Sequence, residues 1–341
     1  MAIETNEIKQ QEQLLSFTMK NKNGAEVEIL NRGATIRAIR VPDREGKIEN
    51  VVLAFDAIED YFDNPHYLGA TVGRVGGRIG HGAFALDGMN YVLEQNQGPH
   101  HIHGGRKGWS SRIWEHQVEG NRLILSLHSP AGENGYPGTV DVTLTFDWSD
   151  ENVLTLTYEA ETTAATPLSP TNHTYFNLTG EAKGTIEQHL LQMDAPCYVP
   201  LDEEALPLGE LVRVDGTPFD FREKRPLHEV THAIDEELTL AGNGLDHPFL
   251  LKENGRIVLD EPISGRRLTV ETSQPGVVVY TGNHLDGDFT VAGRKPTAYL
   301  GICFETQGLP DAINQPEFPS VVLRPGEHYR KETLFHFSSI D

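Results

Sequence analysis

Runs in which apolar and polar residues alternate are the feature that most limits how this chain can fold. Each run has a period of two, is rich in β-branched or aromatic residues and is bounded by Gly, Pro, Asn or Asp, as β-strands are. The runs are LILSLHSP from Leu123, VDVTLTFDW from Val140, VLTLTYEAET from Val153, GVVVYTG from Gly276 and YLGICFET from Tyr299. The 33 Gly and 20 Pro residues are spread along the chain and favour many turns. We therefore expect a predominantly antiparallel β protein.

Helices and domain boundaries are scarce in the sequence. The clearest helical segment is short, from Ala57 to Asp63, and ends before Pro65. No low-complexity linker, charge block or fixed-period repeat divides the chain. Its 341 residues, 38% of them hydrophobic, are enough for one large β domain or two smaller ones. We expect a single domain over residues 1–341.

Composition limits the partners and the compartment. The chain has 28 basic and 50 acidic residues and a net charge of −22, which would repel nucleic acid and anionic membrane surfaces. The first residues, MAIETNEIKQQEQLLSF, are polar, and no later stretch has the length of a membrane span. Cys197 and Cys303, the only cysteines, are expected to be buried small hydrophobes. These features predict a cytoplasmic protein that binds a small neutral or cationic molecule.

A glycine cluster, GRVGGRIG, covers Gly73 to Gly80. Its spacing differs from that of a dinucleotide fingerprint, and no helix followed by a parallel strand is evident. We expect a tight turn beside a strand. Arg78 has a further use, since a guanidinium on such a turn is well placed to hydrogen-bond a ligand.

The segment NQGPHHIHGG, Asn96 to Gly105, contains three histidines in four residues. His101 and His103 would share one face of a strand, as in a metal site of the His-x-His kind. Such a site needs a further ligand from elsewhere, and short histidine clusters in loops more often serve as hydrogen-bonding groups. We expect no bound metal.

The segment TNHTYFNLTG, Thr171 to Gly180, has two interpretations. Asn172 and Asn177 fit the glycosylation acceptor pattern, which has no role in a cytoplasmic protein. His173 stands between hydrogen-bonding residues and ahead of an aromatic pair, where it is suited to proton chemistry. Residue type alone favours a structural histidine.

Two carboxylates follow later in the chain. Asp246 comes after a glycine in GLDHPF, and Glu305 begins ETQGLPDAINQPEFP at the end of an apolar strand. Partial desolvation at such a junction can adjust a carboxyl pKa for base work. An ordinary carboxylate at the edge of a strand is the competing interpretation of Glu305.

Six motifs in order resemble those of the aldose 1-epimerases, the galactose mutarotases. They are GRVGGRI, GPHHIHGG, NHTYFNLTG, GLDHPF, TSQPGVVVYTGN and ETQGLPDAINQPEFP, from Gly73 to Pro319. Any one motif is weak, but six in order are specific. The resemblance implies a large, mostly antiparallel β-sandwich with an open cleft for one sugar.

The resemblance also implies the site. His103 and His173 would face the sugar ring, and Glu305 would act as the base at the anomeric hydroxyl. The sugar-hydroxyl ligands would be Arg78, Asp246 and Gln274. The chain departs from the family at Gly77, where Asn is frequent, and this departure leaves the detailed sugar preference open.

Interconversion of α and β anomers requires a base at the C1 hydroxyl and an acid at the ring oxygen, which exchange roles on reclosure. Glu305 ionised and His173 protonated would form that pair near neutral pH. No redox change or group transfer occurs, so no cofactor is expected. Trp109, Tyr136 and Phe219 would supply an aromatic face for the sugar or belong to the core.

Three other functions compete with this one. A non-catalytic sugar-binding protein would not need Glu305 and His173 together. A hexose-6-phosphate epimerase would need a basic pocket, for which the only local cluster is FREKR, Phe221 to Arg225, more typical of a solvated turn. A metal-dependent enzyme would use His101 and His103. The preferred aldose and the oligomeric state, monomer or homodimer, are not fixed by the sequence.

Overall fold

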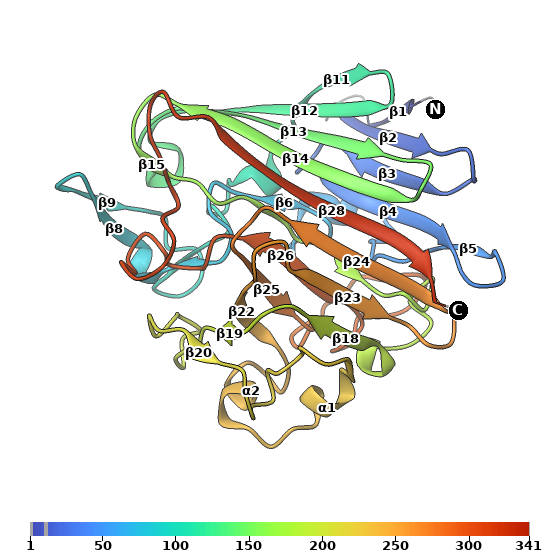
Figure 1. Cartoon of the computed structure of the whole chain (residues 1–341). Helices are drawn as coiled ribbons and strands as arrows, with labels where there is room; N and C mark the ends of the chain where they lie inside the picture. The colour runs from blue at the N-terminus through green and yellow to red at the C-terminus, as the bar shows by residue number, and fades with distance from the viewer. Residues whose placement is uncertain (1–2, 10–12, 341) are drawn as a thin grey trace.

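A nine-stranded antiparallel sheet forms one broad layer of the protein (Figure 1). The structure is a computed structural model that describes residues 3–9 and 13–340. The strands in spatial order are β11 (Glu115–Glu119), β12 (Arg122–Ser129), β13 (Val140–Trp148), β14 (Val153–Thr162), β28 (Tyr329–Ser339), β24 (Arg266–Thr272), β23 (Arg256–Asp260), β18 (Leu190–Met193) and β21 (Arg225–Pro226).

Two smaller antiparallel sheets contribute to the same apolar core. The five-stranded sheet consists of β1 (Ile3–Lys9), β2 (Leu14–Lys20), β3 (Glu26–Leu30), β4 (Thr35–Pro42) and β5 (Ile48–Asn50). The six-stranded sheet has the order β17 (Tyr175–Phe176), β26 (Ile302–Gln307), β25 (Gly276–Tyr280), β22 (Asp246–Leu250), β19 (Cys197–Tyr198) and β20 (Val212–Arg213). Buried side chains of all three sheets form one hydrophobic cluster. The expected antiparallel β-sandwich is confirmed.

The alternation of the strands explains the packing of the layers. In β13 every second side chain, from Val140 to Trp148, is buried, and the residues between them are partly or fully exposed. The Trp148 indole N–H donates to the Ala25 carbonyl, 3.2 Å away, and so joins the nine-stranded sheet to the five-stranded sheet. Phe176 of β17 packs on Phe335 of β28, with ring centroids 5.2 Å apart. The two faces of each strand thus have different partners.

The six-stranded sheet presents its second face away from this core. In β26, Ile302 and Phe304 belong to the large hydrophobic cluster, whereas Cys303 and Glu305 alternate with them. In the neighbouring strands β25 and β22, side chains also alternate between the core and the second face, because residues at every second position of a strand share a face. This second face forms the floor of the cavity described below.

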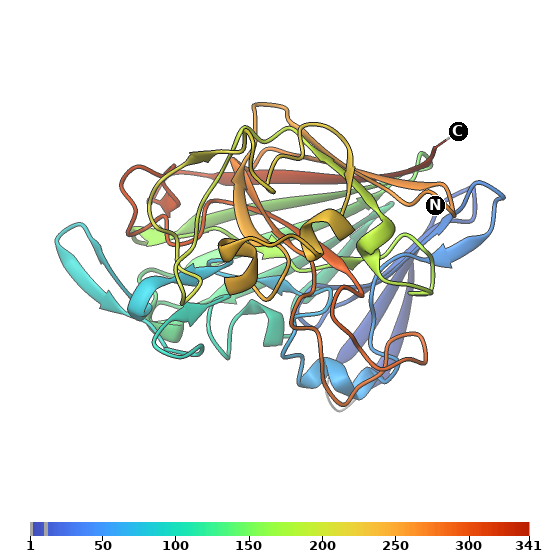
Figure 2. The same cartoon turned by 90° about the horizontal axis from the view of Figure 1, so that it is seen from below.

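Short strand pairs and turns complete the structure around that face. The two-stranded pairs are β7 (Arg78–Ile79) with β10 (His101–Ile102), β6 (Thr71–Val72) with β16 (Thr171–Asn172), β8 (Ala83–Leu86) with β9 (Met89–Val92), and β15 (Thr166–Pro167) with β27 (Val322–Leu323). Seen from below, the β8–β9 hairpin projects from one end of the molecule (Figure 2). The glycine-rich segment Gly73–Gly80 leads into β7, and so the expectation of a turn beside a strand is confirmed.

Helices are few and short in the described residues. The segment expected as a helix, Ala57 to Asp63, contains a 3₁₀ helix over Ile58–Phe62. Four further 3₁₀ turns cover Gly80–Gly82, Trp109–Ser111, Glu133–Gly135 and Ile186–Gln188. The α-helices are α1 (His228–Thr231) and α2 (Glu236–Leu240), neither of which the sequence analysis anticipated. Within the described part of the chain, none of these helices is both long and apolar enough to cross a membrane.

Candidate active site

A cavity of about 190 Å³ lies on the second face of the six-stranded sheet and brings five of the six expected site residues together. They are Arg78, His103, His173, Asp246 and Glu305. Its size suits one monosaccharide ring. The segments that meet there are far apart in the sequence, and the sheet unites them because β26 pairs with β17 on one side and with β25 on the other.

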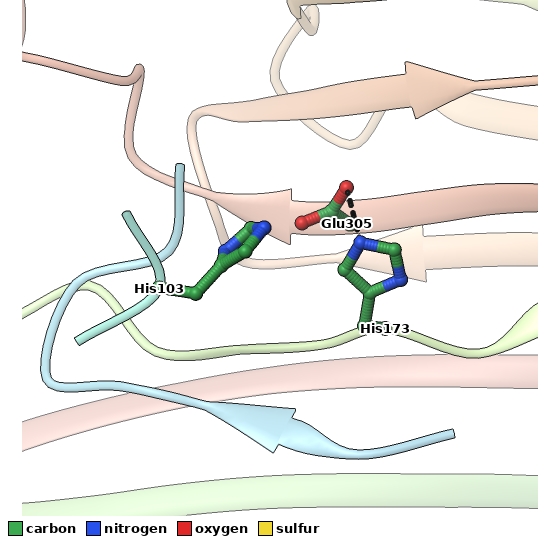
Figure 3. A group of neighbouring side chains, drawn as sticks. All are labelled: His103, His173 and Glu305. Atoms are coloured by element: carbon green, nitrogen blue, oxygen red, sulfur yellow. Dashed lines mark ion pairs between the residues drawn. The ribbon is translucent and has the colours of Figure 1, made fainter. Parts of the chain in front are cut away.

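Glu305 and His173 form the centre of the cavity. The Nε2 atom of His173 lies 3.5 Å from Oε1 of Glu305, and both side chains are buried (Figure 3). Tyr175 of β17 pairs with Cys303 of β26, and His173 lies two residues before Tyr175, on the same side of β26. The backbone of His173 is held by hydrogen bonds with Gly69 and Ala70. Glu305 is thus placed by the sheet, and His173 by the segment that leads into β17.

Burial shifts the pKa values of this pair in opposite directions. Burial, reinforced by the nearby Asp246 carboxylate, raises the pKa of Glu305 to about 8, and Arg78 opposes the shift. Burial lowers the pKa of His173 to about 4. The expectation of an ionised Glu305 beside a protonated His173 is therefore wrong for the unliganded cavity, because removal from water disfavours both charges. Between pH 4 and pH 8 the pair holds one proton, on Glu305.

His103 is fixed by its backbone and by its ring. Its φ of 51° lies in the left-handed region, and it hydrogen-bonds through its own N–H to the Gly77 carbonyl, 3.1 Å away. The following Gly104 has no room for a side chain, since a Cβ there would lie 1.7 Å from the Gly73 carbonyl oxygen. The Gly-Gly sequence after His103 thus permits a close approach of two backbone segments.

The hydrogen bond made by the His103 ring decides what the ring can do. The Gly77 N–H donates to Nδ1 of His103 over 3.2 Å, so the neutral ring carries its proton on Nε2. Burial holds the His103 pKa well below its usual range, and that neutral form is retained. A protonated Nε2 is a hydrogen-bond donor toward a ligand.

The same contact bears on metal binding. Ligand atoms of His103, His173 and Glu305 lie within 4.8 Å of one another, which is close enough to suggest a divalent ion. A histidine that ligates a metal through one nitrogen usually donates a hydrogen from the other. His103 Nδ1 accepts a hydrogen bond instead, so this tautomer does not suit the metal. The donor set fits a sugar better than an ion.

The other histidines of the cluster point away from the cavity. Nδ1 of His101 lies 2.7 Å from the Glu94 carbonyl and its Nε2 lies 2.8 Å from the Tyr136 hydroxyl. Nδ1 of His100 accepts from the His81 N–H. The expected strand face shared by His101 and His103 is wrong, because β10 ends at Ile102 and the chain turns at His103.

Arg78 and Asp246 face the cavity from opposite parts of the fold. Nε of Arg78 donates to the Gln97 side-chain oxygen over 2.7 Å, which orients the guanidinium. Asp246 begins β22, and burial raises its pKa against the opposing charges of Arg78 and His284. A guanidinium and a carboxyl group in one cavity offer a donor set and an acceptor to sugar hydroxyls.

Gln274 is the expected site residue that the structure does not bring to the cavity. It precedes β25 at the end remote from Tyr280, and its amide donates to the Tyr329 hydroxyl over 3.0 Å. It lines a different groove of about 460 Å³, together with Ser169 and Lys331 among others. Its place in the sugar cleft is therefore corrected: strand register, not motif position, decides which residues reach the cleft.

The aromatic residues of the cavity also differ from those considered. Trp109, Tyr136 and Phe219 are buried in the core. Tyr67, Tyr175 and Tyr280 line the cavity in their place. The Tyr67 ring meets His103 edge-on, with centroids 4.7 Å apart, and helps to hold that imidazole in position.

Gly77, the departure from the family pattern, is confined by its surroundings. Its φ is +71°, and a Cβ at this position would lie 2.9 Å from Cγ of Pro310. Asn tolerates a left-handed backbone, but its side chain would displace Pro310. Gly77 and Pro310 both line the cavity, so a larger side chain at position 77 would alter this part of the wall.

The two asparagines of the glycosylation pattern and the two cysteines can be compared with the expectations from the sequence. Asn172 and Asn177 are buried and donate to backbone carbonyls, which agrees with a structural role. Both cysteines are free: the expected burial is confirmed for Cys303 and is wrong for Cys197, which is partly exposed.

The basic run Phe221 to Arg225 lies outside the cavity that contains Glu305 and His173. Its cations form ion pairs with carboxylates: Arg222 with Asp215 and Asp220, Lys224 with Asp260, and Arg225 with Glu229. None of these residues is among the described residues that line the cavity.

Sequence reasoning missed Gln97 and Val278. Gln97 lies in the histidine-rich segment, where attention to histidine alone passed over an amide that orients Arg78. Val278 lies in an expected strand, two residues before Tyr280. The alternation of that strand places Val278 and Tyr280 on the same face. Tyr67 follows a segment without a recognisable motif.

The comparisons with known proteins agree with this geometry. A family model described as aldose 1-epimerase matches residues 16–336. The chain belongs to the aldose 1-epimerase family. It is 43% identical to human galactose mutarotase over 319 residues, which cover 92% of this chain and 91% of that protein. It is 36% identical to the aldose 1-epimerase of Haemophilus influenzae over 328 residues, 94% of this chain and 95% of that protein.

Solved structures of the aldose 1-epimerase family share the fold. An aldose epimerase homologue from C. elegans superposes with a TM-score of 0.89 at 29% identity, over 100% of both chains. A galactose 1-epimerase from Lactobacillus acidophilus superposes with a TM-score of 0.87 at 32% identity, again over 100% of both chains. The protein is accordingly an isomerase that interconverts the anomers of aldoses.

Proposed function

We propose that the protein interconverts the α and β anomers of free hexoses such as galactose and glucose, with Glu305 as base and His173 as acid. The observation that supports these roles is the buried pair itself, a carboxyl oxygen and an imidazole nitrogen that lie 3.5 Å apart. The base and the acid must flank one sugar carbon, and the separation of these two groups suits that arrangement.

The reaction starts from the ionised form of the pair. A sugar that donates its C1 hydroxyl to Glu305 and accepts at its ring oxygen from His173 favours that form, since hydrogen bonds to a charged group stabilise the charge. The proton passes from Glu305 to His173 as the sugar binds. The pair neither gains nor loses a proton overall.

Ring opening then moves two protons. Glu305 takes the proton of the C1 hydroxyl, the C1–O5 bond breaks, and O5 receives the proton from Nε2 of His173. The product is the open-chain aldehyde. Rotation about C1–C2 and reclosure on the other face of the carbonyl reverse both transfers and give the other anomer.

The shifted pKa values assist this step. A carboxylate whose pKa is about 8 is a stronger base than an ordinary one, and an imidazolium whose pKa is about 4 is a stronger acid. Ring opening returns the pair to the neutral state that burial favours. Burial therefore drives the proton transfers in the direction that the reaction needs.

The surrounding residues hold the sugar. His103 donates from Nε2 toward the ring oxygen or a neighbouring hydroxyl, and Arg78 and Asp246 bind hydroxyls farther round the ring. Orientation of this kind makes the proton transfers effectively unimolecular. No step requires a cofactor.

Polarimetry of freshly dissolved α-galactose and α-glucose tests the proposal, with Glu305→Gln as the decisive variant. The amide keeps the size of the side chain and can hydrogen-bond a hydroxyl, but it cannot accept the anomeric proton. We expect mutarotation to fall by about 10²-fold or more while galactose affinity, measured by calorimetry, changes little. Unchanged turnover would show that another group is the base, and a wild-type protein that binds galactose without converting it would be a sugar-binding protein.

A further inference from the structure

The floor of the cavity changes character on the far side of Glu305. Val278 of β25 pairs with Glu305, and Pro248 of β22 pairs with Val278. These two residues and Glu305 form one transverse row across the sheet, and the His173 side chain lies beside Glu305 at the other end of this row: acid, base, valine, proline. Both Val278 and Pro248 line the cavity. Half of this row thus has no side-chain hydrogen-bonding group.

We infer that this apolar half of the row lies under carbon 2 of the sugar, so that the enzyme does not recognise the C2 hydroxyl and accepts 2-deoxyaldoses. This inference rests on the proposed roles of Glu305 and His173. It goes beyond them because it defines which substituent of the substrate is ignored.

The orientation of the sugar follows from the chemistry. The anomeric carbon is bonded to the ring oxygen, to its own hydroxyl and to carbon 2. When the hydroxyl faces Glu305 and the ring oxygen faces His173, carbon 2 must leave the anomeric carbon on the side away from His173. In the register of the sheet, that side is occupied by Val278 and then by Pro248.

Apart from Glu305, the polar floor residues nearest to Val278 belong to the next row. Asp246 pairs with Tyr280, two residues along β25, so it faces a more distant part of the ring. Leu201 and Ala205 add further apolar side chains to the lining of the cavity. The row under carbon 2 is therefore apolar at Val278 and Pro248, and Asp246 is left for another hydroxyl.

The expected selectivity follows from this wall. A site that hydrogen-bonds a substrate hydroxyl strongly rejects the analogue that lacks it, because buried polar groups of the site are then left unpaired. An apolar wall leaves nothing unpaired when the hydroxyl is absent. Removal of the C2 hydroxyl should consequently cost little in kcat/KM.

The test compares galactose with 2-deoxygalactose by polarimetry, after subtraction of each spontaneous rate. For the wild-type enzyme we expect the two kcat/KM values to agree within about 3-fold, in line with the small discrimination that apolar pockets achieve. Val278→Thr is nearly isosteric and adds one hydroxyl at the proposed contact. It should raise the preference for galactose by about 2- to 10-fold, the effect of one hydrogen bond.

Val321→Thr is the matched control, because Val321 lines the groove of Gln274 and not the sugar cavity, and it should leave the preference unchanged. Binding of both sugars to Glu305→Gln provides a second measurement that requires no turnover, with equal affinities expected. A loss of 30-fold or more with 2-deoxygalactose, while galactose reacts normally, would overturn the inference and assign the C2 hydroxyl to Arg78; the proposed function would stand. If the enzyme turned over neither sugar, the proposed function and this inference would both be wrong.

Discussion

Glu305→Gln should make the folded protein more stable as well as inactive. Burial keeps a proton on Glu305 in the folded state up to a pKa of about 8, whereas the same side chain in the unfolded chain ionises at its ordinary value of 4.5. A raised pKa gives stability that is fully present below pH 4.5 and is lost as the pH rises toward 8. Neutral glutamine carries no such pH-dependent loss.

The magnitude can be worked out at pH 7. The solution is then about 2.5 pH units above the unfolded pKa, and at about 1.4 kcal/mol per unit the wild-type fold is disfavoured by on the order of 3 kcal/mol. The side chain is only 3% exposed, so solvent screening removes little of this effect. For a chain of this size we expect a rise in Tm of roughly 2–6 °C.

Thermal unfolding followed by circular dichroism at several pH values measures the effect. The gain in Tm should be full near pH 8, smaller at pH 6 and absent near pH 4, where the wild-type side chain is protonated in both states. Glu203→Gln, at an exposed position, is the control and should shift Tm little at any pH. A gain that is equal at all pH values, or a loss of stability at pH 8, would refute the reasoning from burial.

Three other predictions concern catalysis. The kcat/KM profile should form a plateau between limbs near pH 4 and pH 8. Activity should fall at lower pH because His173 is then protonated beside a neutral Glu305, and at higher pH because the pair has lost its proton. Initial rates measured across this range check the profile, and a single limb near pH 6.5 would contradict it. His173→Asn should fold and lose about 10²- to 10⁴-fold in kcat, as expected for the removal of a general acid; turnover near that of the wild type, with folding verified by circular dichroism, would return His173 to a structural role. Gln274→Ala should retain kcat/KM within about 2-fold, since Gln274 does not line the cavity and its side-chain amide bonds to Tyr329. A 10-fold rise in KM would place Gln274 in the sugar cleft after all.

Long strands were predictable from the sequence because they repeat a pattern. Val140 to Trp148 alternates over nine residues, and the structure forms β13 over that range. The proposed catalytic pair was found by resemblance, since Glu305 and His173 taken alone resemble an edge carboxylate and a structural histidine. The structure adds that both are buried and that they lie 3.5 Å apart.

Features that depend on two or three residues could not be predicted in the same way. Strands β7 and β10, which position Arg78 and His103, have two residues each, too few to show any period. The turn at His103 depends on the room left by Gly104 beside a distant backbone segment. The assignment of Gln274 failed because a motif carries order along the chain, whereas the cleft selects residues by their register across the sheet.

The transverse register that joins Glu305, Val278 and Pro248 separates the floor of the cavity from its walls. Neighbouring strands lie about 4.8 Å apart in any sheet, so the spacing of these floor residues is inherited from the peptide backbone itself. Arg78, His103, His173 and Tyr67 come instead from turns and the ends of two-residue strands, and such segments tolerate insertion and exchange. Evolution or design can therefore rebuild the walls of the cavity without disturbing the row of side chains that carries the proposed base.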